Sequence, residues 1–240
     1  MTHEHAFWEE ELPMLLPIDL DQKPVYIVSK SEAGPGIVGS DSHLAVAFTS
    51  TLLDFRMRPS LEAQGRWRGP GYCIVVINSK WLTGRYDMAL SLLIHELGHA
   101  IESEALDPIR WEVDFVPQLA ERFVADQPLA SSFKQSLPQF TGQPAWCHHE
   151  LNFTRAAAHL YQRARRRERW IPQMFAGDFY RLSEPEVYSD RLADEFKHEA
   201  DTPIVKILRK AVPASLEALW RDDTQKLIVH KDATKPLKGA

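Results

Sequence analysis

Cysteine is scarce in this sequence, with only Cys73 and Cys147 among 240 residues. Two cysteines cannot build the disulfide framework that holds many small secreted domains together. We interpret Cys147 as a small buried side chain. A metal-ligand role for Cys147 is the less favoured alternative, raised because His148 and His149 follow it directly. The sequence also lacks the apolar run of roughly 18 residues that a membrane span needs, so no span is predicted.

The sequence has no excess of basic residues, and its first residues do not predict a secretory leader. The formal net charge of −5 argues against a general nucleic-acid binder. The first residues, MTHEHAFWEEELP, are acidic and do not follow the basic-then-apolar order of a signal peptide. We therefore expect a globular protein that works in the cytoplasm.

One short motif carries chemistry: the segment LLIHELGHAIESE at positions 92–104. His95 and His99 are four residues apart, so on a helix their imidazoles lie on one face. Two neutral imidazoles suit Zn²⁺. Glu96 lies beside that face, where a carboxylate can take a proton from an activated water. This HExxH pattern predicts two zinc ligands and a general base.

The surrounding residues favour a helix. Tyr86–Ser103 contains no proline and a single glycine, Gly98, and it is rich in strong helix formers. Gly98 would let another segment approach closely. An apolar stripe recurs at helical spacing: Leu93, Leu97, Ala100 and Ile101. The competing interpretation is an ordinary buried helix with two hydrogen-bonded histidines.

The other elements are predicted from periodicity and composition. The first twenty residues form an irregular or helical lead-in, broken by prolines. Strands are expected at Val25–Ser29 and Tyr72–Asn78, a helix or a strand at Leu44–Phe55, and loop at Arg58–Gly71. Short helices and loops are expected at Asp107–Pro144, and longer helices at Glu150–Arg169, Pro185–Ala200, Ile204–Lys210 and Ala214–Val229. An edge strand beside the HELGH helix could bind an extended peptide.

A catalytic zinc usually has three protein ligands and one open position. The continuous scheme HExxHxxGxxH does not apply, because Glu102 and Ala105 stand where it needs glycine and histidine. Glu102 is seven residues from His95, about 10 Å along a straight helix, so it cannot easily share one ion with that histidine. The third ligand must come from another segment.

The better candidate segment is WCHHELNFTRAAAHLYQRA, positions 146–164. We rank His149 first, because Phe153 four residues later would anchor that helix against the core. His148 ranks second and His159 third. His149 and His159 are ten residues apart, roughly 15 Å on a straight helix, so they cannot bind one ion together.

HELGH resembles the signature of zincin metallopeptidases. HHELNF is similar to the H-G-x-x-F stretch that supplies the third histidine in SprT-like zincins. Aligning the phenylalanine with Phe153 places that ligand on His149, while Glu150 replaces the glycine. The resemblance covers residues 70–165. It implies an α+β fold: a mostly helical zincin-like domain with a small sheet packed on the HExxH helix.

We therefore expect a zincin-like metal-binding domain at 1–170 and a helical C-terminal extension with a disordered tail, DATKPLKGA, at 171–240. The expected activity is zinc-dependent hydrolysis of a protein or peptide. His95, His99 and His149 would hold Zn²⁺, and Glu96 would act as general base. Candidate oxyanion stabilisers lie on the third-ligand helix: Arg155, His159 and Tyr161.

Two alternatives stay open. The same residues could hold a structural zinc ion that only stabilises the fold of an interaction protein. Cys147 or His148 would then be the fourth ligand. Retention of Glu96 argues against this, because a structural site needs no base. The basic run RARRRER, 163–169, could instead contact nucleic acid, although basic residues at a helix C-terminus also complement the helix dipole. The sequence predicts no oligomeric state.

Overall fold

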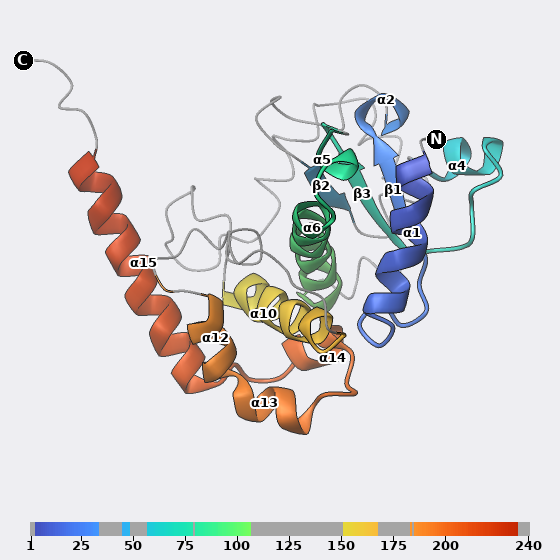
Figure 1. Cartoon of the computed structure of the whole chain (residues 1–240). Coiled ribbons are helices and arrows are strands. Elements are labelled where there is room, and N and C mark those ends of the chain that lie inside the picture. The colour runs from blue at the N-terminus through green and yellow to red at the C-terminus, as the bar shows by residue number, and fades with distance from the viewer. Residues whose placement is uncertain are drawn as a thin grey trace, which may run out of the picture.

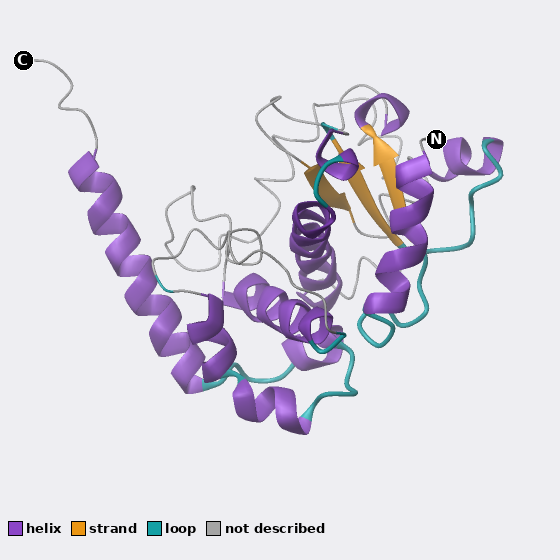
Figure 2. Cartoon of the chain, in the orientation of Figure 1, coloured by secondary structure: helices purple, strands orange, loops and turns teal. Residues whose placement is uncertain are grey.

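A computed structural model describes residues 3–33, 45–48, 57–78, 80–106, 151–167, 183 and 185–234. The chain is α+β and mostly helical, as predicted, with one small sheet (Figure 1, Figure 2). Within these ranges, no helix is both long and apolar enough to cross a membrane.

In the described residues, strands alternate with helices as far as β3, and every later element is a helix. The strands are β1 (Val25–Ser29), β2 (Ala45–Phe48) and β3 (Tyr72–Val76). The helices of the first half are α1 (His3–Leu15), α2 (Lys30–Ala33), α4 (Arg58–Ala63), α5 (Lys80–Thr83) and α6 (Tyr86–Leu106). The helices of the second half are α10 (Leu151–Arg165), α12 (Pro185–Arg191), α13 (Ala193–His198), α14 (Ile204–Leu208) and α15 (Ala214–Thr234).

The sheet has the strand order β1-β3-β2. β1 pairs in parallel with β3, with Val25 opposite Tyr72, and β2 pairs antiparallel to β3, with Ala45 opposite Val76. Every residue of β3 is buried, which fits its unbroken apolar sequence YCIVV. The strand that leads into the HELGH helix is therefore the central strand, and the edges belong to β1 and β2.

The two faces of the sheet bury different partners, because successive side chains of a strand point to opposite faces. One face belongs to the main core, with α1 and α6, and includes Val25, Ile27, Tyr72, Ile74 and Val76. The other face forms a smaller core with α2 and α4, and includes Tyr26, Val28, Cys73 and Val75. Cys73 is thus a buried side chain of the second core.

Helix α6 lies at the centre of the molecule. It packs on β2 and β3 through one side and on α10 and α14 through another (Figure 1). The predicted apolar stripe is buried, with Leu93, Leu97 and Ile101 fully inaccessible to solvent. The sheet therefore supports the helix that carries His95 and His99.

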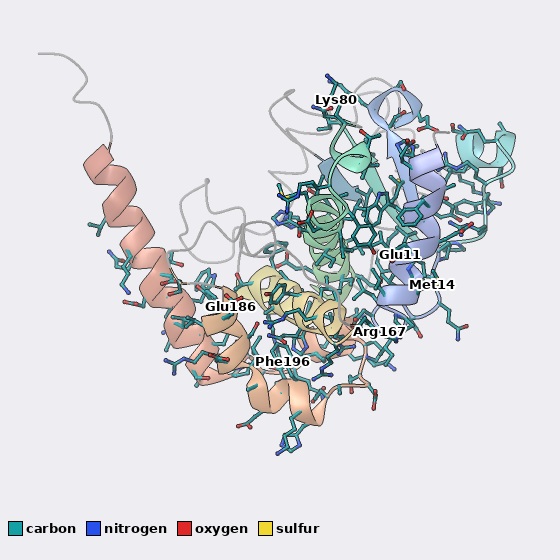
Figure 3. The ribbon with its side chains drawn as sticks, viewed as in Figure 1. Glu11, Met14, Lys80, Arg167, Glu186 and Phe196 are labelled. Atoms are coloured by element: carbon teal, nitrogen blue, oxygen red, sulfur yellow. The ribbon has the colours of Figure 1, made fainter. Side chains whose placement is uncertain are left out.

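The C-terminal helices share a core with α10. Phe153, Ala157 and Ala158 of α10 pack with residues of α12, α13 and α15, among them Tyr188 and Phe196. Figure 3 shows Glu186 and Phe196 on the helices that flank α10. The predicted division at residue 170 stays a prediction. What the structure adds is that α10 is packed between α6 and these later helices.

Most predicted elements are present with shifted ends. β1 has the predicted bounds, and the described part of Leu44–Phe55 is a strand. The prediction of loop throughout Arg58–Gly71 is wrong, because α4 occupies its first six residues. Pro59 stands in the first turn of α4, where its missing N–H costs nothing. Helix α1 also continues through Pro13, whose neighbour Leu12 is fully buried.

The predictions near the C-terminus need two corrections. Pro185–Ala200 is two helices, α12 and α13, separated at Leu192. Helix α15 extends to Thr234, so the first three residues of DATKPLKGA are helical rather than disordered. Residues 235–240 and the segment Asp107–Pro144 lie outside the described residues.

Candidate metal centre

Two predicted ligands lie together on α6. The ring centroids of His95 and His99 are 5.0 Å apart, with an interplanar angle of 77°. Both side chains are partly exposed, whereas the residues on either side of each are buried. The helix thus presents two adjacent imidazoles at the edge of the core, as the four-residue spacing predicted.

Phe153 of α10 contacts both histidines. Its ring stacks on that of His99, with centroids 4.0 Å apart and planes inclined by 21°. It meets the His95 ring in an edge-to-face contact at 5.0 Å. One aromatic side chain therefore restricts both imidazoles, and it comes from the helix that was predicted to follow the third ligand.

Gly98 provides the room for this contact. A Cβ at position 98 would lie 3.1 Å from Cε2 of Phe153 and 3.9 Å from Cβ of Ala157. The first distance is tighter than an ordinary carbon contact, so a larger residue would push α10 away from α6. The glycine inside HELGH is explained by helix packing rather than by backbone conformation.

The protonation state of His95 suits a metal ligand. Burial lowers the pKa of His95 to about 4. The imidazole is therefore neutral at physiological pH, and the neutral form is the one that binds a cation. Glu96, the next residue, is buried with 7% of its surface exposed, so a carboxylate lies at the boundary between the core and the two histidines.

The third ligand lies outside the described residues. This applies to His149, to the second-ranked His148 and to Cys147. His149 is four residues before Phe153, so their Cα atoms can be no more than about 14 Å apart. Within the described ranges, no three His, Cys, Asp or Glu side chains gather as a metal-binding group. The assignment of His149 stays a prediction.

His159, the third-ranked ligand, lies in a different cluster. It is fully buried, its Nε2 is 3.4 Å from a carboxylate oxygen of Glu195, and its ring packs edge-on against Phe196 at 4.5 Å. Glu195 and Phe196 belong to α13, so His159 serves the packing of α10 against the C-terminal helices. His159 is therefore a buried histidine of the core between α10 and α13.

The other two oxyanion candidates also bond to the C-terminal helices. Arg155 donates from Nε to Glu195 at 2.9 Å and from Nη1 to the carbonyl oxygen of Lys210 at 3.1 Å. The Tyr161 hydroxyl donates to Glu186 at 3.1 Å. These side chains hold α10 in place, and sequence reasoning missed Glu195 because it is forty residues from its partner.

The basic run at the end of α10 is partly used within the fold. Arg163 forms a salt bridge with buried Asp19 at 2.6 Å. Arg166 donates to the carbonyl oxygen of Phe196 at 3.2 Å, and the guanidinium of Arg165 lies over the Tyr161 ring at 5.5 Å. Structural contacts therefore account for three of the arginines that had raised the nucleic-acid alternative.

No family model matches this chain, no curated protein matches it, and no solved structure matches it. The resemblance to SprT-like zincins rests on the two motifs alone. The geometry just described, in which α10 packs on the two histidines of the first motif, is an observation independent of that resemblance.

The contact between Phe153 and the histidines can be measured by NMR. The ring should shift the imidazole proton resonances of His99 upfield, and Phe153→Leu should move them back downfield. We expect this change to cost about 1 kcal/mol of stability, the usual value of an aromatic pair. Phe196→Leu is the matched control, because it should move the resonances of His159 instead. Unchanged His99 resonances in Phe153→Leu would contradict the stacked arrangement.

The buried His159 predicts a loss of stability in mild acid. Burial lowers its pKa below the ordinary 6.5, an effect that Glu195 opposes and Arg163 and Arg155 reinforce. The unfolded chain therefore binds the proton more readily. The contribution of neutral His159 to stability is fully present above the ordinary pKa of 6.5. Below that pH the free energy of unfolding falls by at most about 1.4 kcal/mol per pH unit. Urea unfolding at pH 7.5 and 5.5 should show a smaller decline in His159→Gln than in the wild type.

The exposed histidine of α13, His198, provides the control for this measurement. His198→Gln should leave the decline between the two pH values as it is in the wild type. An equal decline in wild type and His159→Gln would show that other groups set the acid sensitivity.

Proposed function

We propose that this protein is a zinc-dependent metallopeptidase of the zincin type, with His95, His99 and His149 as ligands and Glu96 as general base. The observation that carries the proposal is the position of Phe153. Its ring touches both α6 histidines, so the chain that leaves His149 reaches the HELGH helix within four residues. The two motifs are thus neighbours in space although 50 residues separate them in sequence.

The residues present fit a zinc ion. Two imidazoles at one helix edge, with a further histidine four residues before Phe153, form the nitrogen-rich set that zinc prefers. Bound zinc would polarise the scissile carbonyl and lower the pKa of a water molecule at the site. Glu96, next to His95, would accept the proton of the attacking water and pass it to the leaving amine.

The substrate we propose is a protein or peptide in extended conformation. In the described residues β2 pairs with β3 alone, and β2 packs against α6. A peptide that added to the β2 edge by main-chain hydrogen bonds would run beside the helix that carries the site. The expectation that the protein acts in the cytoplasm also stays part of this proposal.

Metal content tests the ligand set. After dialysis against a mild chelator, elemental analysis should find about one zinc per wild-type chain, because three protein ligands hold the ion. His95→Ala and His149→Ala should each lose most of it, and His198→Ala, a change at an exposed histidine on α13, should keep it. Circular dichroism of each variant checks that the helices persist.

Three results would change the ligand assignment or the proposed function. Full zinc in His149→Ala would move the third ligand to His148 or to another residue. A wild type that binds no zinc would contradict the proposed function. Zinc binding without any peptide hydrolysis would favour the alternative in which zinc only stabilises an interaction protein.

The general base is tested by Glu96→Gln, which keeps the shape of the side chain and removes its charge. We expect zinc binding to persist and cleavage of fluorescently labelled, denatured casein to fall at least about a hundredfold, the usual contribution of a general base. Glu10→Gln, the same change at an exposed glutamate of α1, is the matched control and should keep both zinc and cleavage. A cleavage rate in Glu96→Gln equal to that of the wild type would exclude Glu96 from the reaction.

A further inference from the structure

The two edges of the sheet differ in what covers their main-chain groups. The Tyr72 N–H donates to the Pro24 C=O at 2.9 Å. This hydrogen bond shows which residues of β1 direct their main-chain groups to β3 and which direct them away. Alternate residues of a parallel strand direct their N–H and C=O groups to the same neighbour. Tyr26 therefore faces β3, and the residues whose groups face away from the sheet are Val25, Ile27 and Ser29.

Charged side chains bond to the main-chain groups of Ile27 that face away from the sheet. Its N–H donates to Oε1 of Glu9, from α1, at 2.8 Å. Its carbonyl oxygen accepts a hydrogen bond from Nη2 of Arg66 at 2.9 Å. The same guanidinium bonds to the Glu9 carboxylate. A donor and an acceptor from side chains thus stand where a neighbouring strand would place its own main-chain groups.

The residues on either side are covered in the same way. The Val25 carbonyl oxygen accepts from Nη2 of Arg68 at 2.9 Å. The Ser29 N–H donates to Oε2 of Glu32 at 2.7 Å. We call Glu9, Glu32, Arg66 and Arg68 the charged clamp. It contains two carboxylates and two guanidinium groups, so their charges balance beside the sheet.

The clamp is held in place by its own contacts. Arg66 and Glu9 each expose only 8% of their side chains, and Arg66 also bonds to Glu32 at 3.0 Å. The Tyr26 hydroxyl accepts from the N–H of Arg68 at 2.8 Å and donates to the Gly69 carbonyl at 2.7 Å. Segment 66–69 is therefore fixed along β1, because a buried ion pair with satisfied hydrogen bonds is costly to break from one side.

We propose that the charged clamp takes the place of a fourth strand, closes the β1 edge to any extended chain, and so confines strand addition to the β2 edge. An open edge with unpaired main-chain groups is a template for another chain, including a second copy of the same protein. The statement about β2 rests on the proposed function. The closure of β1 does not, and its test needs neither zinc nor peptidase activity.

Residue-resolved amide exchange tests the closure. In the wild type the Ile27 amide should exchange slowly, like the amide of Val28, although only the latter faces a strand. Glu9→Ala removes the acceptor, so Ile27 should exchange roughly tenfold faster while Tyr26 and Val28 keep their rates. Glu9→Gln retains an acceptor oxygen and should preserve most of the protection. Glu10→Ala, a change at an exposed glutamate of the same helix, should have no effect.

Sedimentation then tests whether the opened edge accepts a strand. Glu9→Ala combined with Arg66→Ala should associate more strongly with rising concentration than the wild type does. A fast-exchanging Ile27 amide in the wild type, or one unaffected by Glu9→Ala, would overturn the role of the clamp. If the Ile27 amide of the double variant exchanges fast but the variant associates no more than the wild type, the proposal that the clamp closes the β1 edge is overturned. If Glu9→Ala does not fold, the wild-type and Glu9→Gln exchange rates still decide the first point.

Discussion

The close contact of α6 and α10 determines the arrangement of the rest of the molecule. It depends on one small residue and one large one, because Phe153 can lie over α6 only where Gly98 has no side chain. The sheet supports α6 from one side, and α12, α13 and α14 hold α10 from the other. Two imidazoles that would be mobile on an isolated helix are thereby restricted by an aromatic ring, which is the preorganisation that a metal site requires.

Polar groups are buried in this fold where they fix the position of one element against another. Arg155, Glu195 and His159 join α10 to α13, and Arg163 and Asp19 join it to the turn after α1. Burial raises the pKa of Asp19 to about 7 in spite of the neighbouring Arg163 guanidinium, so these interactions are not simply favourable. They specify which surfaces meet, whereas the apolar core provides most of the stability.

Sequence reasoning was most successful where the controlling interactions are local. The apolar run of β3, the β-branched residues of β1 and the helical spacing of HELGH each depend on neighbours within one or two turns. The prediction of loop over Arg58–Gly71 is wrong at α4. Pro59 is a residue common in loops, but here it stands in the first turn of a helix. Sequence reasoning also missed the Glu9 contact with Ile27 and the Glu195 contact with Arg155, since no pattern in a single sequence pairs residues that far apart. The third ligand stays a prediction because His148 and His149 lie outside the described residues.

The bracing of α10 by later residues has a consequence for biosynthesis. A ribosome-bound chain that has emerged only as far as residue 167 contains both motifs, yet Arg155 and His159 still lack Glu195, and Arg155 also lacks the carbonyl of Lys210. Those groups cannot be buried at low cost until residues 195–210 have left the exit tunnel. We therefore expect α10 to reach its final position beside the histidines of α6 only late in synthesis.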